Sequence, residues 1–338
     1  MTDIKIINNK FYINNIMANQ GNHYSEGKLI GVYTDMCSFF DNNLLDVEHN
    51  KREFIKNLSI WQDFGVNLIT VGFQGPNPFD EYYKKARERD KSQNISFNSS
   101  ALKSDGSLEF DYLENAEEII RAADHLNYIV LVNILSSSCE DIFEDEFAII
   151  NGIFNIIGWI LKKNFSNIIV NITDVAHTFY KSSVLTGNGI IKILKSVKEK
   201  TKDKLIIGAG IKTFVSMSEK NICEYIKLSD FIPIYTNSVI NTKSFHNTKK
   251  MIENIYFFKK IMRDTGRKIP IIMAKGDDLS DRHNSYGKNN LTEALENGIS
   301  WCYYDRDGFV ILKNQSIHWD KNSSPEKINF FETLENIK

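Results

Sequence analysis

The chain has 338 residues, of which 42% are apolar and 25% charged, which is typical of a globular protein with one large or two modest domains. Its formal net charge is −2 and its lysines are interleaved with acidic residues, so neither nucleic acid nor a membrane is expected as a partner. The N-terminal stretch lacks the apolar core of a signal peptide, and no apolar run approaches the length of about 18 residues that spans a bilayer. We therefore expect a cytoplasmic protein.

The first predicted element is a small hairpin at residues 4–16, with Asn8-Asn9 at its turn. We accordingly divide the chain into a hairpin and lead-in at 1–27 and a main domain at 28–338. From residue 28 onward, apolar runs alternate with segments of helical periodicity. The expected strands are 28–34, 66–73, 128–135, 167–173, 204–210, 230–236, 268–274 and 298–304, and the expected helices are 51–65, 111–127, 144–164, 188–201, 218–228, 248–266, 289–297 and 323–337.

The expected strands are continuous apolar runs, as is usual when both faces of a parallel sheet are covered. Eight strand–helix units predict an α/β protein of the (β/α)8 TIM-barrel class. A doubly wound dinucleotide-binding fold is disfavoured, because "GAGIKT" (208–213) has Thr213 where the phosphate-binding pattern needs its third glycine. We interpret this segment as a turn.

Active sites of such barrels lie at the carboxyl ends of the strands, so polar residues in or after each strand are the candidates. Carboxylates and amides hydrogen-bond hydroxyl groups, and aromatic rings cover the faces of sugars. This inventory favours a carbohydrate or glycoside ligand and calls for no cofactor. The candidate contacts are Asp35, Gln74, Asn98, Asp174, His177, Tyr235, Asp277, Asp278 and Trp301, the last of which is also a candidate for the barrel core.

Several stretches resemble the cellulase-like glycoside hydrolases of clan A, which includes family 5, and most closely a bacterial subgroup of uncharacterised cellulase-like barrels. Together they cover most of residues 28–337 in the expected order. The stretches are "FNSSALKSDGSLEFDYLENAEEIIRAAD" (97–124), "DEFAIINGIFNIIGWILKKNFSNIIVNI" (145–172), "SDFIPIY" (229–235), "PIIMAKGDD" (270–278), "GISWCYYD" (298–305) and "NQSIHWDKNSSPEKINFFETLENI" (314–337).

The resemblance implies two catalytic glutamates, one after the fourth strand as Asn-Glu and one after the seventh. Thr173-Asp174 stands at the first position. At the second, Lys275-Gly276 with one extra residue replaces the Asn-Glu, and Asp277-Asp278 follows. Both glutamates are therefore replaced, and Asp174 and Asp277 are the remaining candidates for a catalytic pair.

Two carboxyl groups about 5–5.5 Å apart support a retaining mechanism, and a gap of about 6.5–9.5 Å supports an inverting one. Because Asp is one C–C bond shorter than Glu, this pair favours inversion, with Asp174 as acid and Asp277 as base. It requires the backbone to bulge inward at Lys275-Gly276. The alternative is a catalytically inactive relative that acts as a carbohydrate-binding or scaffold protein.

Other chemistries are less favoured by the sequence. Lys275 at a strand end could form a Schiff base, but nothing nearby predicts a phosphate or carbonyl site. The acidic run "GDDLSDRH" (276–283) lacks the fixed spacing of a metal site, so no metal is expected. The cysteines form no CxxC pair and predict neither zinc nor a disulfide framework, and no pattern predicts an oligomeric state.

Overall fold

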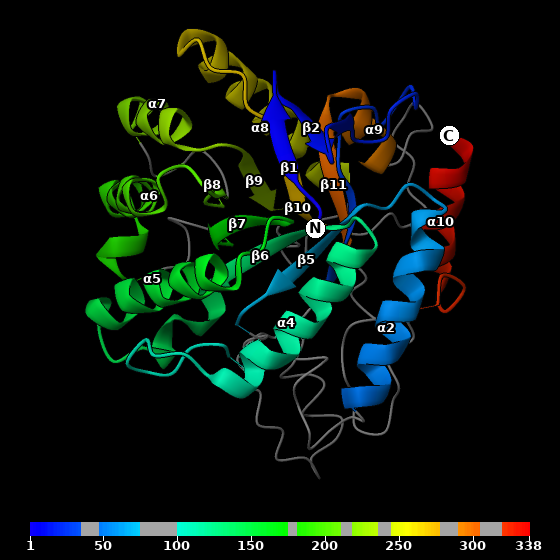
Figure 1. Cartoon of the computed structure of the whole chain (residues 1–338). Coiled ribbons are helices and arrows are strands. Elements are labelled where there is room, and N and C mark those ends of the chain that lie inside the picture. The colour runs from blue at the N-terminus through cyan, green and yellow to red at the C-terminus, as the bar shows by residue number, and fades with distance from the viewer. Residues whose placement is uncertain are drawn as a thin grey trace.

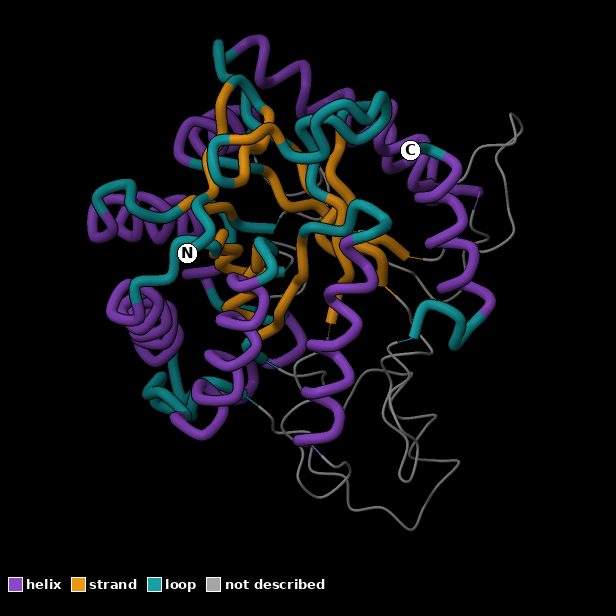
Figure 2. The backbone as a smooth tube through the Cα atoms, turned by 45° about the vertical axis from the view of Figure 1, so that its right-hand side comes forward, coloured by secondary structure: helices purple, strands orange, loops and turns teal. Residues whose placement is uncertain are grey.

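The computed structural model describes residues 1–34, 47–74, 100–174, 181–210, 218–235, 245–277, 290–304 and 320–338. Within these ranges, eight parallel strands form one sheet that curves into a nearly closed barrel, and helices surround it (Figures 1 and 2). The expected (β/α)8 fold is therefore confirmed.

The predicted strands and helices all overlap observed ones, with ends that differ by a few residues. The barrel strands are β4 (Ile30–Thr34), β5 (Leu68–Gly72), β6 (Ile129–Leu135), β7 (Ile168–Thr173), β8 (Ile206–Gly208), β9 (Ile232–Tyr235), β10 (Ile271–Asp277) and β11 (Ile299–Tyr304). The α-helices are α2 (Val47–Gln62), α4 (Phe110–His125), α5 (Glu146–Lys163), α6 (Asn188–Thr201), α7 (Glu219–Leu228), α8 (Phe245–Asp264), α9 (Asn290–Glu296) and α10 (Pro325–Asn336), and two short 3₁₀ helices are η1 (Ser137–Ile142) and η2 (Ser183–Leu185).

Strand β6 explains why the apolar runs are continuous. Ile129 and Leu131 belong to the apolar cluster that fills the barrel, whereas Val130 and Val132 belong to the larger cluster between the strands and the helices. Successive residues of a strand point to opposite faces, so a strand covered on both sides needs apolar residues at every position.

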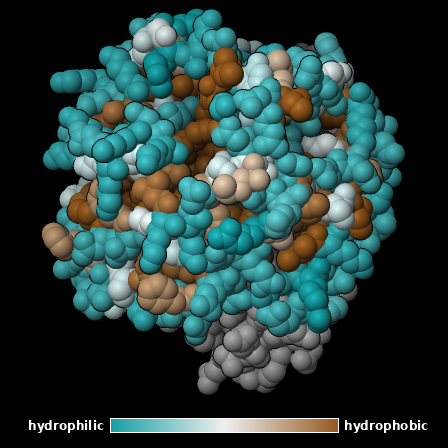
Figure 3. Space-filling model, viewed as in Figure 1, coloured by the Kyte–Doolittle hydropathy of each residue, from teal (hydrophilic) through white to brown (hydrophobic). Residues whose placement is uncertain are grey.

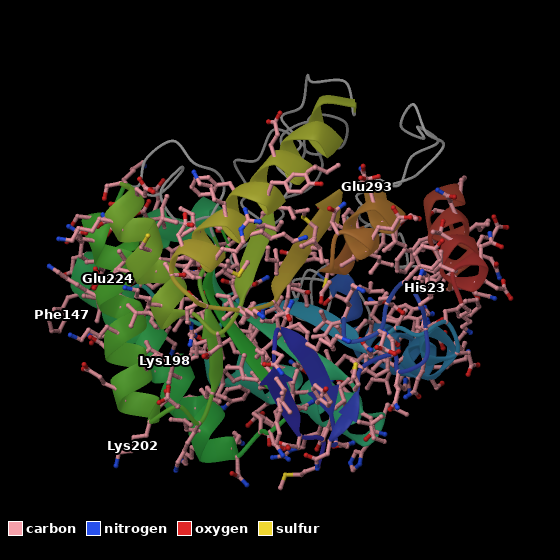
Figure 4. All side chains as sticks on the ribbon, turned by 90° about the horizontal axis from the view of Figure 1, so that it is seen from above. His23, Phe147, Lys198, Lys202, Glu224 and Glu293 are labelled. Atoms are coloured by element: carbon pink, nitrogen blue, oxygen red, sulfur yellow. The ribbon has the colours of Figure 1, made fainter. Side chains whose placement is uncertain are left out.

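The seam of the barrel lies between β8 and β9, the two end strands of the hydrogen-bonded order β8-β7-β6-β5-β4-β11-β10-β9. Asp230, just before β9, joins them. Its backbone N–H donates to the carbonyl of Ile207 at 2.9 Å, and its carboxylate accepts from the N–H of Ile207 at 2.8 Å. Lys198 of α6 donates to the same carboxylate (Figure 4). A charged side chain therefore bridges strands that no ladder joins among the described residues.

The N-terminal hairpin is present, with β1 (Ile4–Ile7) paired to β2 (Lys10–Ile13) and a further short strand β3 (Ile16–Met17). Asn8 and Asn9 have φ of 51° and 62°, the left-handed pair that a tight two-residue turn requires. Phe11 is fully buried in the same cluster as the barrel residues Leu29 and Ile272. The hairpin thus covers the amino-terminal end of the barrel, and the division at 27/28 stays a prediction.

Candidate active site at the carboxyl end of the barrel

A hydrogen-bonded polar triad lies inside the barrel near the carboxyl ends of its strands. Asn171 of β7 donates from Nδ2 to Asn133 Oδ1 of β6 at 2.8 Å and to the Tyr235 hydroxyl of β9 at 2.6 Å. The Tyr235 hydroxyl donates to Asn133 Oδ1 at 2.8 Å. All three side chains are more than nine-tenths buried. The barrel interior therefore changes from aliphatic to amide and phenol groups where strands β6, β7 and β9 approach their carboxyl ends.

The triad keeps spare hydrogen-bonding capacity. Asn133 Nδ2 and Asn171 Oδ1 are buried and have no hydrogen-bond partner among the described residues. Burial, and secondly the nearby charge of Asp174, raises the pKa of Tyr235 well above its ordinary value. The phenol consequently stays neutral and donates a hydrogen bond at physiological pH. An unpaired buried amide is costly, which is characteristic of a site where a ligand or water completes the network.

Asp174 follows β7 directly and is half-buried. Its backbone N–H donates to the Leu135 carbonyl at 3.1 Å, which continues the ladder between β6 and β7 past the last strand residue. The Ser136 hydroxyl donates to Asp174 Oδ2 at 3.3 Å. The backbone of Asp174 is thus held by Leu135, the last residue of β6, and its carboxylate by Ser136, the next residue.

Gln74 completes this cluster from the β5 side. Its Oε1 accepts from the backbone N–H of Ser136 at 2.8 Å, and its Nε2 is buried without a partner in the described part of the chain. Gln74, Ser136 and Asp174 therefore form a chain of contacts across three neighbouring strand ends. An amide donor and a carboxylate in one such chain can hold the hydroxyl groups of a bound ligand.

The close approach of β8 explains Gly210. Its N–H donates to the Thr173 carbonyl at 2.8 Å, and a Cβ at this position would lie 2.0 Å from the Asp174 carbonyl oxygen. Any larger residue would push the backbone that carries Asp174. Gly210, the last residue of the "GAG" segment, therefore stands at a position that requires glycine, beside the candidate acid Asp174.

The far side of the site is shaped by a bulge in β10. Met273 pairs with Trp301 and Gly276 with Tyr303, so β10 has one residue more than β11 over this interval. The interruption falls where the sequence predicts one extra residue. A single-residue bulge reverses the faces of the positions that follow it, and position 277 is in register with Tyr304.

The remaining predicted contacts fall into two groups. Asp35, Asn98, His177 and Asp278 lie outside the described residues, and for Asp277 and Lys275 only the backbone is described. Trp301 is fully buried in the cluster between the strands and the helices, where a Cβ at Gly276 would lie 2.3 Å from its ring. The expected stacking of Trp301 on a sugar is therefore corrected, because its side chain faces the helix layer and packs in the core.

The sequence analysis missed the triad residues Asn133 and Asn171 as candidate contacts. Their signal is an asparagine within an otherwise apolar strand, "IVLVNIL" and "IIVNIT", at matching positions that pair directly in the sheet. It also missed Tyr33 and Tyr304 on the adjacent strands β4 and β11, whose rings meet edge to face at 5.3 Å. These aromatic rings lie at strand ends, which is where a sugar-covering surface would be expected.

Two carboxylates hold the backbone of residues 181–183, which lie a few positions after Asp174 in the sequence. The Glu140 carboxylate accepts from the backbone N–H groups of Lys181 and Ser182, and the Glu146 carboxylate accepts from Ser183 and from the Ser182 hydroxyl. These hydrogen bonds lower the pKa of Glu146. Glu140 of η1 and Glu146 at the start of α5 thereby fix the position of residues 181–183.

In the described ranges, no group of three or more His, Cys, Asp or Glu side chains is placed to hold a metal ion. No described helix combines the length and the apolar character that crossing a bilayer requires.

Cys302 is buried beside the Thr70 hydroxyl at 3.0 Å, and burial raises the pKa of its thiol to about 12, so it is an unreactive packing residue.

These features define the class of the protein: a (β/α)8 barrel with a polar, hydrogen-bonded carboxyl end and an apolar, covered amino-terminal end. No family model and no curated protein sequence matches the chain.

Solved structures do match it, and glycoside hydrolases are among them. The family 5 mannosidase from Rhizomucor miehei has a TM-score of 0.59 at 11% identity, over 99% of this chain and 98% of its own. The endo-β-1,4-mannanase from Thermotoga petrophila has a TM-score of 0.56 at 12% identity, over 92% and 77%. A GH5-4 endoglucanase from Clostridium longisporum has a TM-score of 0.54 at 11% identity, over 92% and 97%. At these identities the similarity shows a shared (β/α)8 barrel fold.

Proposed function

We propose that this protein binds a carbohydrate at the carboxyl end of its barrel and hydrolyses a glycosidic bond there, with Asp174 and Asp277 as the carboxylate pair. The observation that carries the proposal is the Gln74–Ser136–Asp174 chain beside the buried Asn133–Asn171–Tyr235 triad. These groups hydrogen-bond hydroxyls and have unused capacity. Neighbours of the same fold are described with sugars, namely a mannosidase with mannosyl-fructose and a mannanase with maltose and glycerol.

In the proposed reaction, Asp174 donates its proton to the glycosidic oxygen as the bond to the anomeric carbon breaks. Asp277 takes a proton from the water molecule that forms the new C–O bond on the opposite face of the sugar. Asp174 follows the fourth barrel strand and Asp277 is the last residue of the seventh, and their shorter side chains favour the wider gap of an inverting enzyme. Gln74, Tyr235, Asp35, Asn98, His177 and Asp278 are proposed to position the sugar.

A second candidate is a catalytically inactive relative that keeps the sugar site as a carbohydrate-binding or scaffold protein. It is supported by the sequence resemblance, which implies Asn-Glu at the positions of Thr173-Asp174 and Lys275-Gly276. The two candidates share the ligand class and differ only in turnover.

The test is a screen of aryl glycosides and natural oligosaccharides at several pH values, with wild type beside Asp174→Asn. General acid catalysis contributes about 10²–10⁴-fold, so the variant should lose that much turnover and keep sugar binding, because Asn preserves shape and hydrogen bonds. Two carboxylates in one site separate each other's titrations, so the wild-type rate should follow a bell-shaped pH curve.

Asp203→Asn is the matched control, because Asp203 is an exposed carboxylate in the turn after α6, paired only with Lys198 among the described residues. Its turnover should equal that of wild type. Unchanged turnover in Asp174→Asn would refute the catalytic assignment. Sugar binding without turnover in every protein would establish the inactive relative, and absence of both would refute the carbohydrate site.

A further inference from the structure

A pocket lies at the amino-terminal end of the barrel, opposite the proposed sugar site. It has a volume of about 610 Å³, within the range of about 300–1,000 Å³ that small-molecule sites occupy. It is formed by the end of α8, the segment leading into β10, the start of β11 and Asn9 at the tip of the hairpin. Figure 3 looks from the side on which the hairpin lies and shows apolar side chains exposed within a mostly hydrophilic surface.

The pocket combines apolar walls with positive charge. Met262, Ile269, Pro270, Ile271 and Ile299 supply the walls. The charged residues that line it are all basic, namely Lys259, Arg263, Arg267 and Lys268. In the described part of the chain, no ion pair joins any of these four cations to a carboxylate. The pocket is therefore electrostatically complementary to an anion.

Two of the cationic side chains, Lys259 and Arg267, are partly buried and have more N–H groups than their described hydrogen bonds use. Lys259 donates one hydrogen bond, to the Asn297 carbonyl at 2.7 Å, and burial lowers its pKa. Arg267 donates from one terminal nitrogen to the Ser229 carbonyl at 3.1 Å, while its Nε is buried without a partner among the described residues. A buried guanidinium nitrogen with no acceptor is costly, and a bound anion would relieve that cost.

Helix-end electrostatics do not account for this arrangement. Arg263 lies in the last turn of α8, where a cation is favourable beside the free carbonyl groups. Arg267 and Lys268 lie beyond the end of the helix at Asp264, in the segment that leads into β10. Their convergence on the pocket is a property of the tertiary fold.

We infer that this pocket is a binding site for a small organic anion, with a phosphate or carboxylate group held by Arg263, Arg267 and Lys259 and an apolar body packed on the walls. The site is independent of the proposed sugar site, because it lies at the other end of the strands. A purely inorganic anion would leave the apolar walls uncovered, and a neutral apolar molecule would leave the cations unpaired.

The test is calorimetric titration of the full chain with phenyl phosphate, inorganic phosphate and benzyl alcohol. Phenyl phosphate should bind about tenfold more tightly than either of the others, because only it uses both the charges and the walls. Arg263→Gln should weaken phenyl phosphate about tenfold, as loss of one charge-assisted contact does. Arg267→Lys, which keeps the positive charge, should weaken it less.

Lys202→Gln is the matched control, because Lys202, labelled in Figure 4, directly follows α6 and is not among the residues that line this pocket. Its affinity for phenyl phosphate should stay within about twofold of wild type, and so should that of Asp174→Asn, which separates this site from the sugar site. Equal affinity for phosphate and phenyl phosphate would overturn the inference. So would the absence of binding, or binding unaffected by Arg263→Gln in a variant whose thermal melt matches wild type.

Discussion

The two ends of the barrel interior are built from different chemistry. At the amino-terminal end, Leu29, Ile129 and Phe231 fill the barrel, and Phe11 of the hairpin closes it. Toward the carboxyl end, Asn133, Asn171 and Tyr235 occupy the same interior and bond to one another. One end gains stability from burying apolar area. The other leaves buried amide groups unpaired, at a cost in free energy that we propose a bound ligand offsets.

Apolar packing and polar site residues are therefore separated along the barrel axis. Conserving the amino-terminal packing would maintain the fold, while changes at the carboxyl end alter the site without a proportional loss of stability. Four substitutions test this separation by measuring the free energy of unfolding together with sugar binding or turnover.

The largest effect is expected from Phe231→Ala at the apolar end. Phe231 is fully buried inside the barrel, so its truncation leaves a cavity and should lower the free energy of unfolding by about 3–5 kcal/mol. Turnover per folded molecule should not change. Phe231→Leu, which retains most of the volume, should cost less. A loss of turnover at temperatures where Phe231→Ala is fully folded would contradict the separation of the two ends.

Gly210→Ala should combine both effects. The added methyl group overlaps the Asp174 carbonyl oxygen, so the strand end must shift, at a cost of about 1–3 kcal/mol. Because Asp174 moves with its backbone, turnover or sugar affinity should also fall. Gly158→Ala in α5 is the control, since a Cβ there meets nothing within 4 Å, and it should stabilise the protein slightly. Wild-type turnover in Gly210→Ala would show that Asp174 is not held as described.

Tyr235→Phe isolates the hydrogen-bonding role of the carboxyl end. It removes the hydroxyl that bridges Asn133 and Asn171, at a cost of about 1–2 kcal/mol in unfolding free energy, and should weaken sugar binding or turnover. Tyr128→Phe is a matched control, because its buried hydroxyl donates to the Leu58 carbonyl at 2.7 Å, outside the triad. Both variants should lose a similar amount of unfolding free energy, but only Tyr235→Phe should lose sugar binding or turnover. Equal functional losses in the two variants would argue against the triad as part of the site.

The smallest effect is expected from Glu117→Gln on the outer surface of α4. Burial opposes the shift, but hydrogen bonds from Lys163 and Arg121 outweigh it and lower the pKa of Glu117 below its ordinary value of 4.5. A lowered folded-state pKa stabilises the protein above pH 4.5, and this contribution is lost as the pH falls through the folded-state value.

Wild type should therefore be more stable than Glu117→Gln by about 1 kcal/mol or less at pH 7, with the difference vanishing in acid. Denaturant melts of both proteins from pH 7 to pH 3 measure it. A difference that grows on acidification would have the wrong sign for a salt-bridged carboxylate. Turnover at pH 7 should be the same in both.

The alternation of apolar runs with helical periodicity was enough to predict the barrel, its strands and the hairpin turn at Asn8-Asn9. The reason is local: continuous apolar runs require two covered faces, and the turn requires residues that accept positive φ. The position of Asp174 at a strand end followed in the same way. The extra residue at Lys275-Gly276 was visible in the sequence, and its register shift is present in β10.

Which side each strand residue faces was decided only by the tertiary structure. In a strand that is apolar on both faces, the sequence carries no period-two signal, so Trp301 could not be assigned to the core or the site before the register was known. The same ambiguity concealed Asn133 and Asn171, which meet only because β6 and β7 pair in this register and Tyr235 closes the triad from β9. The pocket lined by Lys259, Arg263, Arg267 and Lys268 likewise depends on the tertiary structure. It forms because α8, β10, β11 and the hairpin tip, which are far apart in the sequence, converge at one end of the barrel.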